Sequence, residues 1–149
     1  MKKLGILGGM GPESTLLYYK EIAAAYKRKD KNGNFPALTI EIVNMYEMLG
    51  YCKAQQYDKL ADYLLQGIYN LEKAGVDFAV LASNTPHVVF DVLEEKAHIP
   101  LLNIVEPTYQ AMKVKQGVRV FANQGCAAMG YDLPAAIGAL TANHQGRTI

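Results

Sequence analysis

The stretch that decides the fold is the opening segment Leu4-Gly5-Ile6-Leu7-Gly8-Gly9-Met10-Gly11-Pro12-Glu13-Ser14-Thr15. Residues 4–7 form a short apolar run that stops at paired glycines, which is typical of a buried strand running into a turn. A helix is expected next, because Pro12 suits the first helical turn and Glu13 and Ser14 place an acid and a capping hydroxyl at its positive end. The segment therefore predicts a strand, a glycine loop and a helix in immediate succession.

The same alternation of short apolar runs and helical segments continues along the chain. Their β-branched and apolar content predicts further strands over residues 37–43, 76–82, 99–105 and 117–121. Helices are expected from Pro12 along the stripe Leu16, Tyr19, Ile22, Ala23 and Tyr26, over residues 57–74, after Pro86, and over residues 106–112. Residues 44–56 form a polar excursion. Glu41 indicates that the second strand lies toward an edge of the sheet.

Strands that alternate with helices at short intervals predict an α/β fold. The expected architecture is a three-layer domain with a parallel, flavodoxin-like sheet of strand order 2-1-3-4-5. In that order the winding reverses between strands one and three, and ligands bind beyond the carboxyl ends of the strands at this point. The fold thus singles out two loops, residues 8–15 and residues 83–87.

Composition narrows the class of partner. The chain has 149 residues and a formal net charge of +1, so no net field attracts nucleic acid or an anionic membrane. No apolar run approaches a membrane span of about 20 residues, and the N-terminal run is too short for a signal peptide. The two cysteines, Cys52 and Cys126, lack the spacing of a disulfide scaffold or a metal site. These features predict a soluble cytoplasmic protein without a metal, whose partner is a small molecule.

Backbone N–H groups at two helix starts in one crevice would suit a carboxylate or phosphate. A dinucleotide is disfavoured, because residues 9–14 lack the third glycine of GxGxxG and Glu13 would repel pyrophosphate. Alternatively, the glycine loop is a tight turn that holds no ligand. Residues 83–85 can likewise be a capping sequence with Thr85 as N-cap and Pro86 at the first helical position. His87 could orient a proton or a carboxylate, or be an ordinary surface residue.

The opening segment, followed by Tyr18-Tyr19, closely resembles the start of the aspartate/glutamate racemase family, which works without pyridoxal phosphate. The resemblance covers residues 1–118 and continues in the family's order through four more segments. These are Tyr57-Asp58-Lys59, Ala74-Gly75-Val76-Asp77, Ser83-Asn84-Thr85-Pro86-His87 and Ile99-Pro100-Leu101-Leu102-Asn103-Ile104. It implies two pseudosymmetric α/β domains that face each other across the substrate, each supplying one proton-transfer residue at a strand end, with no cofactor.

The resemblance also implies roles for individual residues. Ser83 occupies the first proton-transfer position, where the family usually has cysteine and some members have threonine. A serine hydroxyl is a far weaker base than a thiolate, so this step is expected to be slow or one-directional. The remaining expected substrate-binding residues come from both loops: Asn84, Thr85 and His87 from one, and Met10, Gly11, Ser14 and Thr15 from the other.

After about residue 118 the resemblance changes. Residues 120–149, and above all Ala128-Met129-Gly130-Tyr131-Asp132-Leu133-Pro134-Ala135-Ala136-Ile137-Gly138-Ala139, resemble a segment of acetolactate synthase-type thiamine diphosphate enzymes. The Gly-Asp-Gly segment that binds magnesium and diphosphate in those enzymes does not follow. The expected division is therefore a racemase-like lobe over residues 1–118 and an appended edge strand plus helix over residues 119–149. Cys126 would be either a substitute thiol or a structural cysteine.

Three functions follow from these resemblances. The first is a cofactor-independent racemase-like protein that acts on aspartate, glutamate or a similar small dicarboxylate by abstraction and return of the Cα proton, and is weak as a half-enzyme. The second is a non-catalytic remnant or binding module from a gene fusion or chimera. The third is a fragment of a thiamine diphosphate enzyme. Because an isolated lobe exposes the face that a second lobe would cover, a homodimer is also expected.

Overall fold

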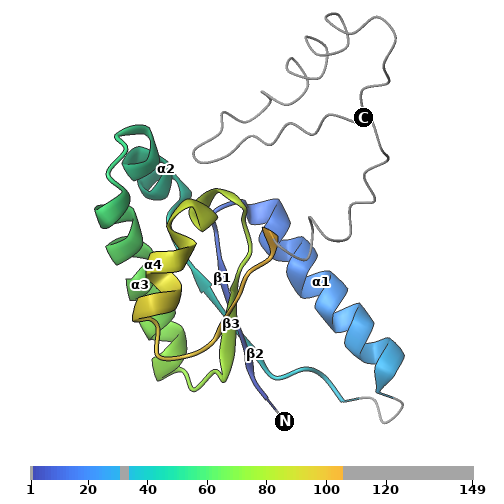
Figure 1. Ribbon diagram of the computed structural model, residues 1–149. Helices are drawn as coiled ribbons and strands as arrows, with labels where there is room; N and C mark the ends of the chain where they lie inside the picture. Colours follow the sequence, from blue (N-terminus) through green and yellow to red (C-terminus); the bar gives the residue numbers. More distant parts are fainter. Residues whose placement is uncertain (1, 31–33, 106–149) are drawn as a thin grey trace, which may run out of the picture.

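The structure is a computed structural model that describes residues 2–30 and 34–105, and its centre is a parallel sheet (Figure 1). The strands are β1 (Leu4–Gly8), β2 (Leu38–Ile42), β3 (Phe78–Leu81) and β4 (Leu101–Leu102), in the order β2-β1-β3-β4. This order confirms the first four places of the predicted flavodoxin-like sheet, with β2 at an edge as Glu41 indicated. The predicted fifth strand (residues 117–121), the helix over residues 106–112, and the appended segment 119–149 with Cys126 lie outside the described residues.

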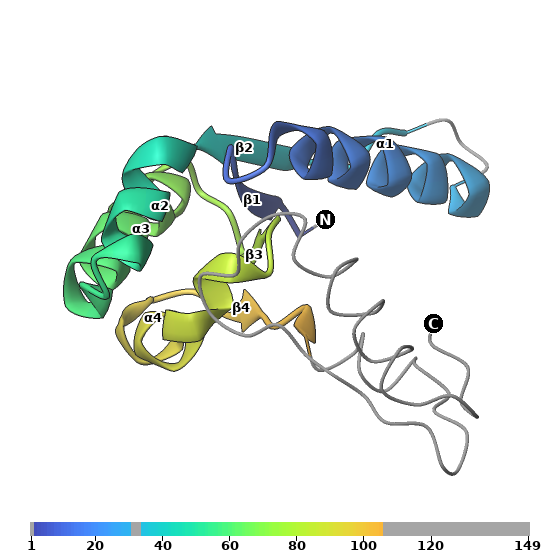
Figure 2. The same cartoon turned by 90° about the horizontal axis from the view of Figure 1, so that it is seen from above.

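Helices cover both faces of this sheet. They are α1 (Pro12–Lys29), α2 (Met45–Lys53), α3 (Tyr57–Lys73), the 3₁₀ turn η1 (Thr85–Val89) and α4 (Phe90–Lys96). Figures 1 and 2 show α1 on one side of the sheet and α2, α3 and α4 on the other. In the ranges 2–30 and 34–105, no helix has the length and apolar character to cross a membrane.

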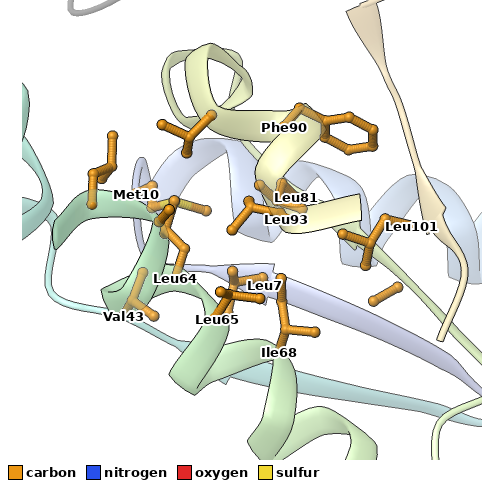
Figure 3. Packing of buried hydrophobic residues seen from close by; sticks show 14 of the residues in the cluster. Leu7, Met10, Val43, Leu64, Leu65, Ile68, Leu81, Phe90, Leu93 and Leu101 are labelled. Carbon is orange, nitrogen blue, oxygen red and sulfur yellow. The ribbon is translucent and has the colours of Figure 1, made fainter. Parts of the chain in front are cut away.

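The main core lies between the sheet and the helices α3 and α4 (Figure 3). Leu7 and Leu81 project from neighbouring strands toward Leu64, Ile68 and Leu93, and all five side chains are fully buried. A second, smaller cluster on the opposite face contains Ile6, Val80 and Ala82. Burial of alternate strand residues on both faces is the pattern of a parallel sheet between two helical layers.

Helix α2 lies in the polar excursion, where the sequence predicted no helix. Asn44 caps it, because its side chain accepts hydrogen bonds from the backbone N–H groups of Tyr46 and Glu47 at 2.9 and 3.4 Å. Met48 and Cys52, one helical turn apart, are the buried residues of its inner face. An N-cap followed by an i, i+4 apolar pair was the available signal for this helix.

The predicted apolar stripe of α1 is wrong at its first two positions, Leu16 and Tyr19, and right at Ile22. Leu16 is 68% exposed and Tyr19 is 43% exposed, whereas Thr15 is buried and Tyr18 and Ile22 pack against the smaller cluster. The buried face therefore starts from a polar residue. Thr15 faces the sheet because its side chain occupies the space beside Gly8, and that contact sets the rotation of the helix.

Candidate functional site

The glycine loop after β1 turns sharply because two of its residues have no side chain. Gly9 has a φ of +85°, and a Cβ there would lie 2.4 Å from the carbonyl oxygen of Val43. A Cβ on Gly8 would lie 2.5 Å from Cγ2 of Thr15. Only glycine satisfies both the left-handed conformation and these close approaches.

The hydroxyl of Thr15 closes this loop onto the first turn of α1. It accepts a hydrogen bond from the Gly9 backbone N–H at 3.0 Å and lies 3.2 Å from the Gly11 carbonyl oxygen, to which it donates. The N-cap of α1 is Gly11, and no side chain caps this helix. The expected capping by Ser14 is therefore wrong, because its hydroxyl points back to carbonyl oxygens. Among the described residues, no side chain accepts a hydrogen bond from the first N–H groups of α1.

Ser14 joins the glycine loop to the end of β3. Its Oγ lies 2.8 Å from the Gly11 carbonyl oxygen and 2.6 Å from the carbonyl oxygen of Ala82, a residue 68 positions away. The Ala82 N–H donates in turn to the Leu7 carbonyl oxygen at 2.9 Å. The two loops that the strand order singled out are therefore directly connected.

The second loop does not begin an α-helix as predicted. Residues 85–89 form the 3₁₀ turn η1, its N-cap is Asn84 rather than Thr85, and α4 starts only at Phe90. The His87 N–H donates to the carbonyl oxygen three residues back, on Asn84, at 3.0 Å. The Ser83 carbonyl, which an α-helix would use there, instead faces the His87 imidazole. The tight turn follows from this exchange of partners.

His87 is held on three sides. Its Nδ1 lies 2.9 Å from the Ser83 carbonyl oxygen, the Ile104 N–H donates to its Nε2 at 3.5 Å, and its ring stacks on Phe90 at 5.1 Å. Burial lowers the pKa of His87 from its ordinary value of 6.5, and the two backbone contacts at Ser83 and Asn84 offset only part of this effect. The ring is therefore neutral at neutral pH.

The other polar side chains of this loop are uncommitted. Within the described part of the chain, the side chains of Ser83, Asn84 and Thr85 have no hydrogen-bond partner, and Asn84 is exposed. Met10, expected to contact substrate, is buried in the main core (Figure 3). The loops thus contain two kinds of polar side chain. Ser14 and His87 bond the backbone and hold the loops, whereas Ser83, Asn84 and Thr85 are available to a ligand.

Comparison of the chain with known protein families and structures identifies the family to which it belongs. The model of the Asp/Glu/hydantoin racemase family matches residues 7–122, a range that contains both loops and all described strands except the start of β1. The chain belongs to the Asp/Glu/hydantoin racemase family.

Relatives of this racemase-family chain include proteins of known sequence and structure. The broad specificity amino-acid racemase RacX of Bacillus subtilis (strain 168) is 30% identical over 112 residues, which are 70% of this chain and 47% of RacX. The crystal structure of an aspartate racemase homologue from Pyrococcus horikoshii OT3 matches with a TM-score of 0.67 and 33% identity, covering 74% of this chain and 48% of that one.

A more distant structural relative supports the fold alone. The aspartate racemase of Picrophilus torridus has a TM-score of 0.58 and 22% identity, with 74% of this chain and 46% of that chain covered. The chain therefore spans about half the length of these relatives. Their similarity confirms the α/β architecture of one racemase-type lobe.

In this racemase-family chain, two hollows lie outside the two loops. One, of about 440 Å³, runs along α1 past Leu17, Tyr18 and Ile22. The other, of about 340 Å³, lies between β2 and α3 beside Asn44 and Tyr63. Residues 2–30 and 34–105 also hold no group of three metal-ligating side chains.

Proposed function

We propose that the chain acts as an amino-acid racemase on aspartate, glutamate or a similar small dicarboxylate, by cofactor-independent abstraction and return of the Cα proton. One observation carries this proposal: three adjacent polar side chains, Ser83, Asn84 and Thr85, are uncommitted at the carboxyl end of β3 among the described residues. They lie beside the uncapped start of α1, which Ser14 ties to the same strand end. A carboxylate suits this combination of side-chain and backbone donors.

In the proposed reaction, Asn84 and Thr85 hold the substrate's α-carboxylate. When the Cα–H bond breaks, its electron pair moves into that carboxylate, and donors at the strand end stabilise the resulting enediolate. Ser83, as a neutral hydroxyl, delivers a proton to one face of Cα. A group on the other face removes the original proton, and Cys126 is a candidate for that group. The substrate is inverted when a proton has arrived from the face opposite to the departure of the first, and solvent water then returns a proton to the Ser83 alkoxide and takes one from the opposing group.

The racemase proposal is tested by following the Cα proton itself. L-Aspartate and L-glutamate are incubated with the full chain in deuterated water, and loss of the Cα signal is followed by proton NMR. Removing an acid–base group reduces such a step by roughly 100-fold or more, so Ser83→Ala should form little D-isomer in the same samples, measured by chiral chromatography, whereas Ser83→Cys should form more than wild type. Thr39→Val, which removes a hydroxyl from β2, is the matched control. No exchange by wild type would refute the catalytic proposal.

A non-catalytic binding module is the second candidate, favoured by a specific observation. Serine stands at position 83, where the resemblance to the family places cysteine, and the chain spans about half the length of its relatives. Calorimetric titration with aspartate, glutamate and succinate separates the two functions. Binding without Cα exchange would support the module, while binding with exchange would support the racemase.

We propose that a second copy of the chain supplies the residues on the face of the substrate opposite Ser83. If two chains complete one site, exchange per chain should increase with protein concentration as the dimer forms. Sedimentation of the same samples gives the fraction of dimer. Exchange that is independent of concentration, in a protein that sediments as a monomer, would refute this arrangement.

A further inference from the structure

Two consecutive carbonyl groups follow the last residue of β3, beyond the end of the sheet ladder. The ladder with β1 ends at the pair Leu7 and Leu81. The next carbonyl, on Ala82, accepts a hydrogen bond from the Ser14 hydroxyl, and the one after it, on Ser83, faces Nδ1 of His87. Side chains from two different elements, α1 and η1, thus replace the sheet partners that these carbonyls lack.

The contacts of His87 define its tautomer. Nε2 accepts from the Ile104 N–H, and Nδ1 faces a carbonyl oxygen that can only accept, so the ring proton lies on Nδ1. A neutral ring in this state has no further N–H to offer a substrate carboxylate. Its partner in stacking, Phe90, is itself 4% exposed and belongs to the main core, which fixes the plane of the imidazole.

The contacts of Ser14 are equally committed. The hydroxyl carries one proton, and both of its neighbours, the carbonyl oxygens of Ala82 and Gly11, are acceptors. The proton is therefore used within the protein. Its shorter contact, 2.6 Å, is to Ala82, the residue immediately before Ser83.

We propose that Ser14 and His87 are positioning residues that clamp the two peptide groups on either side of the Ser83 Cα and do not contact the substrate. The clamp is a property of the free protein. Its catalytic consequence rests on the proposed function: it fixes the direction in which Ser83, Asn84 and Thr85 leave β3. Ser14 aligns the strand end with the glycine loop, and His87 aligns it with the segment that follows β4.

The variants separate hydrogen bonding from packing. His87→Phe keeps a ring that can stack on Phe90 and removes both nitrogens, while His87→Asn restores a donor near the place of Nδ1. Ser14→Ala removes the hydroxyl and Ser14→Thr retains it. His98→Phe is the matched control, because His98 also stacks on a ring, that of Tyr69, and uses Nδ1 to contact Glu72.

The first measurement needs no activity. In full-length protein with ¹⁵N-labelled histidine and backbone, His87 should give the signals of the neutral Nδ1–H tautomer at neutral pH. From the usual strength of one hydrogen bond, His87→Phe should speed exchange of the Ile104 amide by roughly three- to tenfold. It should also shift the amide signals of Ser83 to Thr85, as should Ser14→Ala, whereas His98→Phe should not. An Nε2–H tautomer, or unchanged signals in the variants, would overturn the clamp even if the protein proves to be a racemase.

The second measurement uses Cα exchange in deuterated water. Misplacing a reacting group reduces turnover by roughly 10- to 100-fold, so Ser14→Ala and His87→Phe should lower kcat to this extent with KM changed less than about threefold. Ser14→Thr and His87→Asn should recover part of the loss. A large rise in KM at unchanged kcat would instead mean direct substrate contact and overturn the inference. If wild type shows no exchange, the proposed function fails, and the NMR result still decides the clamp.

Discussion

The contact between Gly8 and Thr15 makes a quantitative prediction about the glycine loop. Alanine at Gly8 places a methyl group 2.5 Å from Cγ2 and 2.7 Å from Oγ1 of Thr15. Thr15 is 6% exposed and is held by two backbone contacts, so it cannot move without losing them. Overpacking of this kind costs about 1–3 kcal/mol, and we expect Gly8→Ala to lower the free energy of unfolding by that amount.

A second substitution, Thr15→Ala, removes the two side-chain atoms that the methyl group at position 8 would clash with. Thr15→Ala loses two hydrogen bonds at about 0.5–1.5 kcal/mol each, which gives a loss of about 1–3 kcal/mol. In the double variant, of the three Thr15 atoms nearest to the methyl group at position 8 only the Cβ remains, at 3.2 Å. Most of the clash is then absent. The double variant should be about as stable as Thr15→Ala alone, which corresponds to a favourable coupling of about 1–3 kcal/mol.

Equilibrium unfolding in urea, followed by circular dichroism, measures all four corners of this cycle. Gly50→Ala is the matched control, since a Cβ at that position in α2 meets no described atom within 4 Å apart from its chain neighbours and the backbone of its own helix. Alanine in an open helical position stabilises by about 0.5–1 kcal/mol. If the losses at positions 8 and 15 add to within about 0.5 kcal/mol, the two residues are not in steric conflict and the account of the loop is refuted.

Three further predictions concern His87, Gly9 and Leu64. Because burial lowers the pKa of His87, the unfolded chain binds more protons than the folded protein below pH 6.5, so the free energy of unfolding should fall as the pH drops from 6.5 through the folded pKa. Urea unfolding at about pH 7.5 and about pH 5.5 should show a smaller loss of this free energy for His87→Phe than for wild type. Gly9→Ala should lower thermal stability more than Gly8→Ala, since it adds left-handed strain to a clash with the backbone of Val43, and an equal or smaller effect would contradict this. Leu64→Ala, at a fully buried position, should cost about 2–5 kcal/mol by urea unfolding, and a loss below about 1 kcal/mol would show that the site is not core.

The strands were predictable because their signals are local. Apolar runs bounded by glycine, proline or asparagine marked all four described strands, and the edge position of β2 followed from a single charge, Glu41. Three of the four described ladders proved shorter than their apolar runs, most clearly in β4, which pairs only at Leu101 and Leu102, whereas β1 pairs through Gly8, one residue past its run. An apolar run records burial, whereas a ladder also needs a hydrogen-bonding neighbour, and the neighbour is set by tertiary structure.

The loops were predictable in place and less so in detail. Their location followed from the strand order, but the roles of their hydroxyl and imidazole groups depended on carbonyls distant in sequence. Ser14 resembles a helix cap locally, and only the approach of Ala82 shows where its proton goes. The first two positions of the α1 stripe were misjudged for the same reason, because the buried Thr15 contact outweighs the apolar pattern of Leu16 and Tyr19. Cross-loop contacts of this type are absent from a single sequence.

At position 83 the backbone carbonyl is hydrogen-bonded within the protein and the side-chain hydroxyl is not, among the described residues, and this difference decides what a substitution there would report. The Ser83 carbonyl is held by His87, but within the described residues the Ser83 hydroxyl takes no part in holding the loop. Exchanging that oxygen for sulfur therefore removes no described contact, while it replaces a very weak acid with one whose pKa is about 8.5. A change of activity in Ser83→Cys would thus report proton-transfer chemistry separately from folding. The clamp makes this separation possible, because it positions the residue through its backbone and leaves the side chain to the reaction.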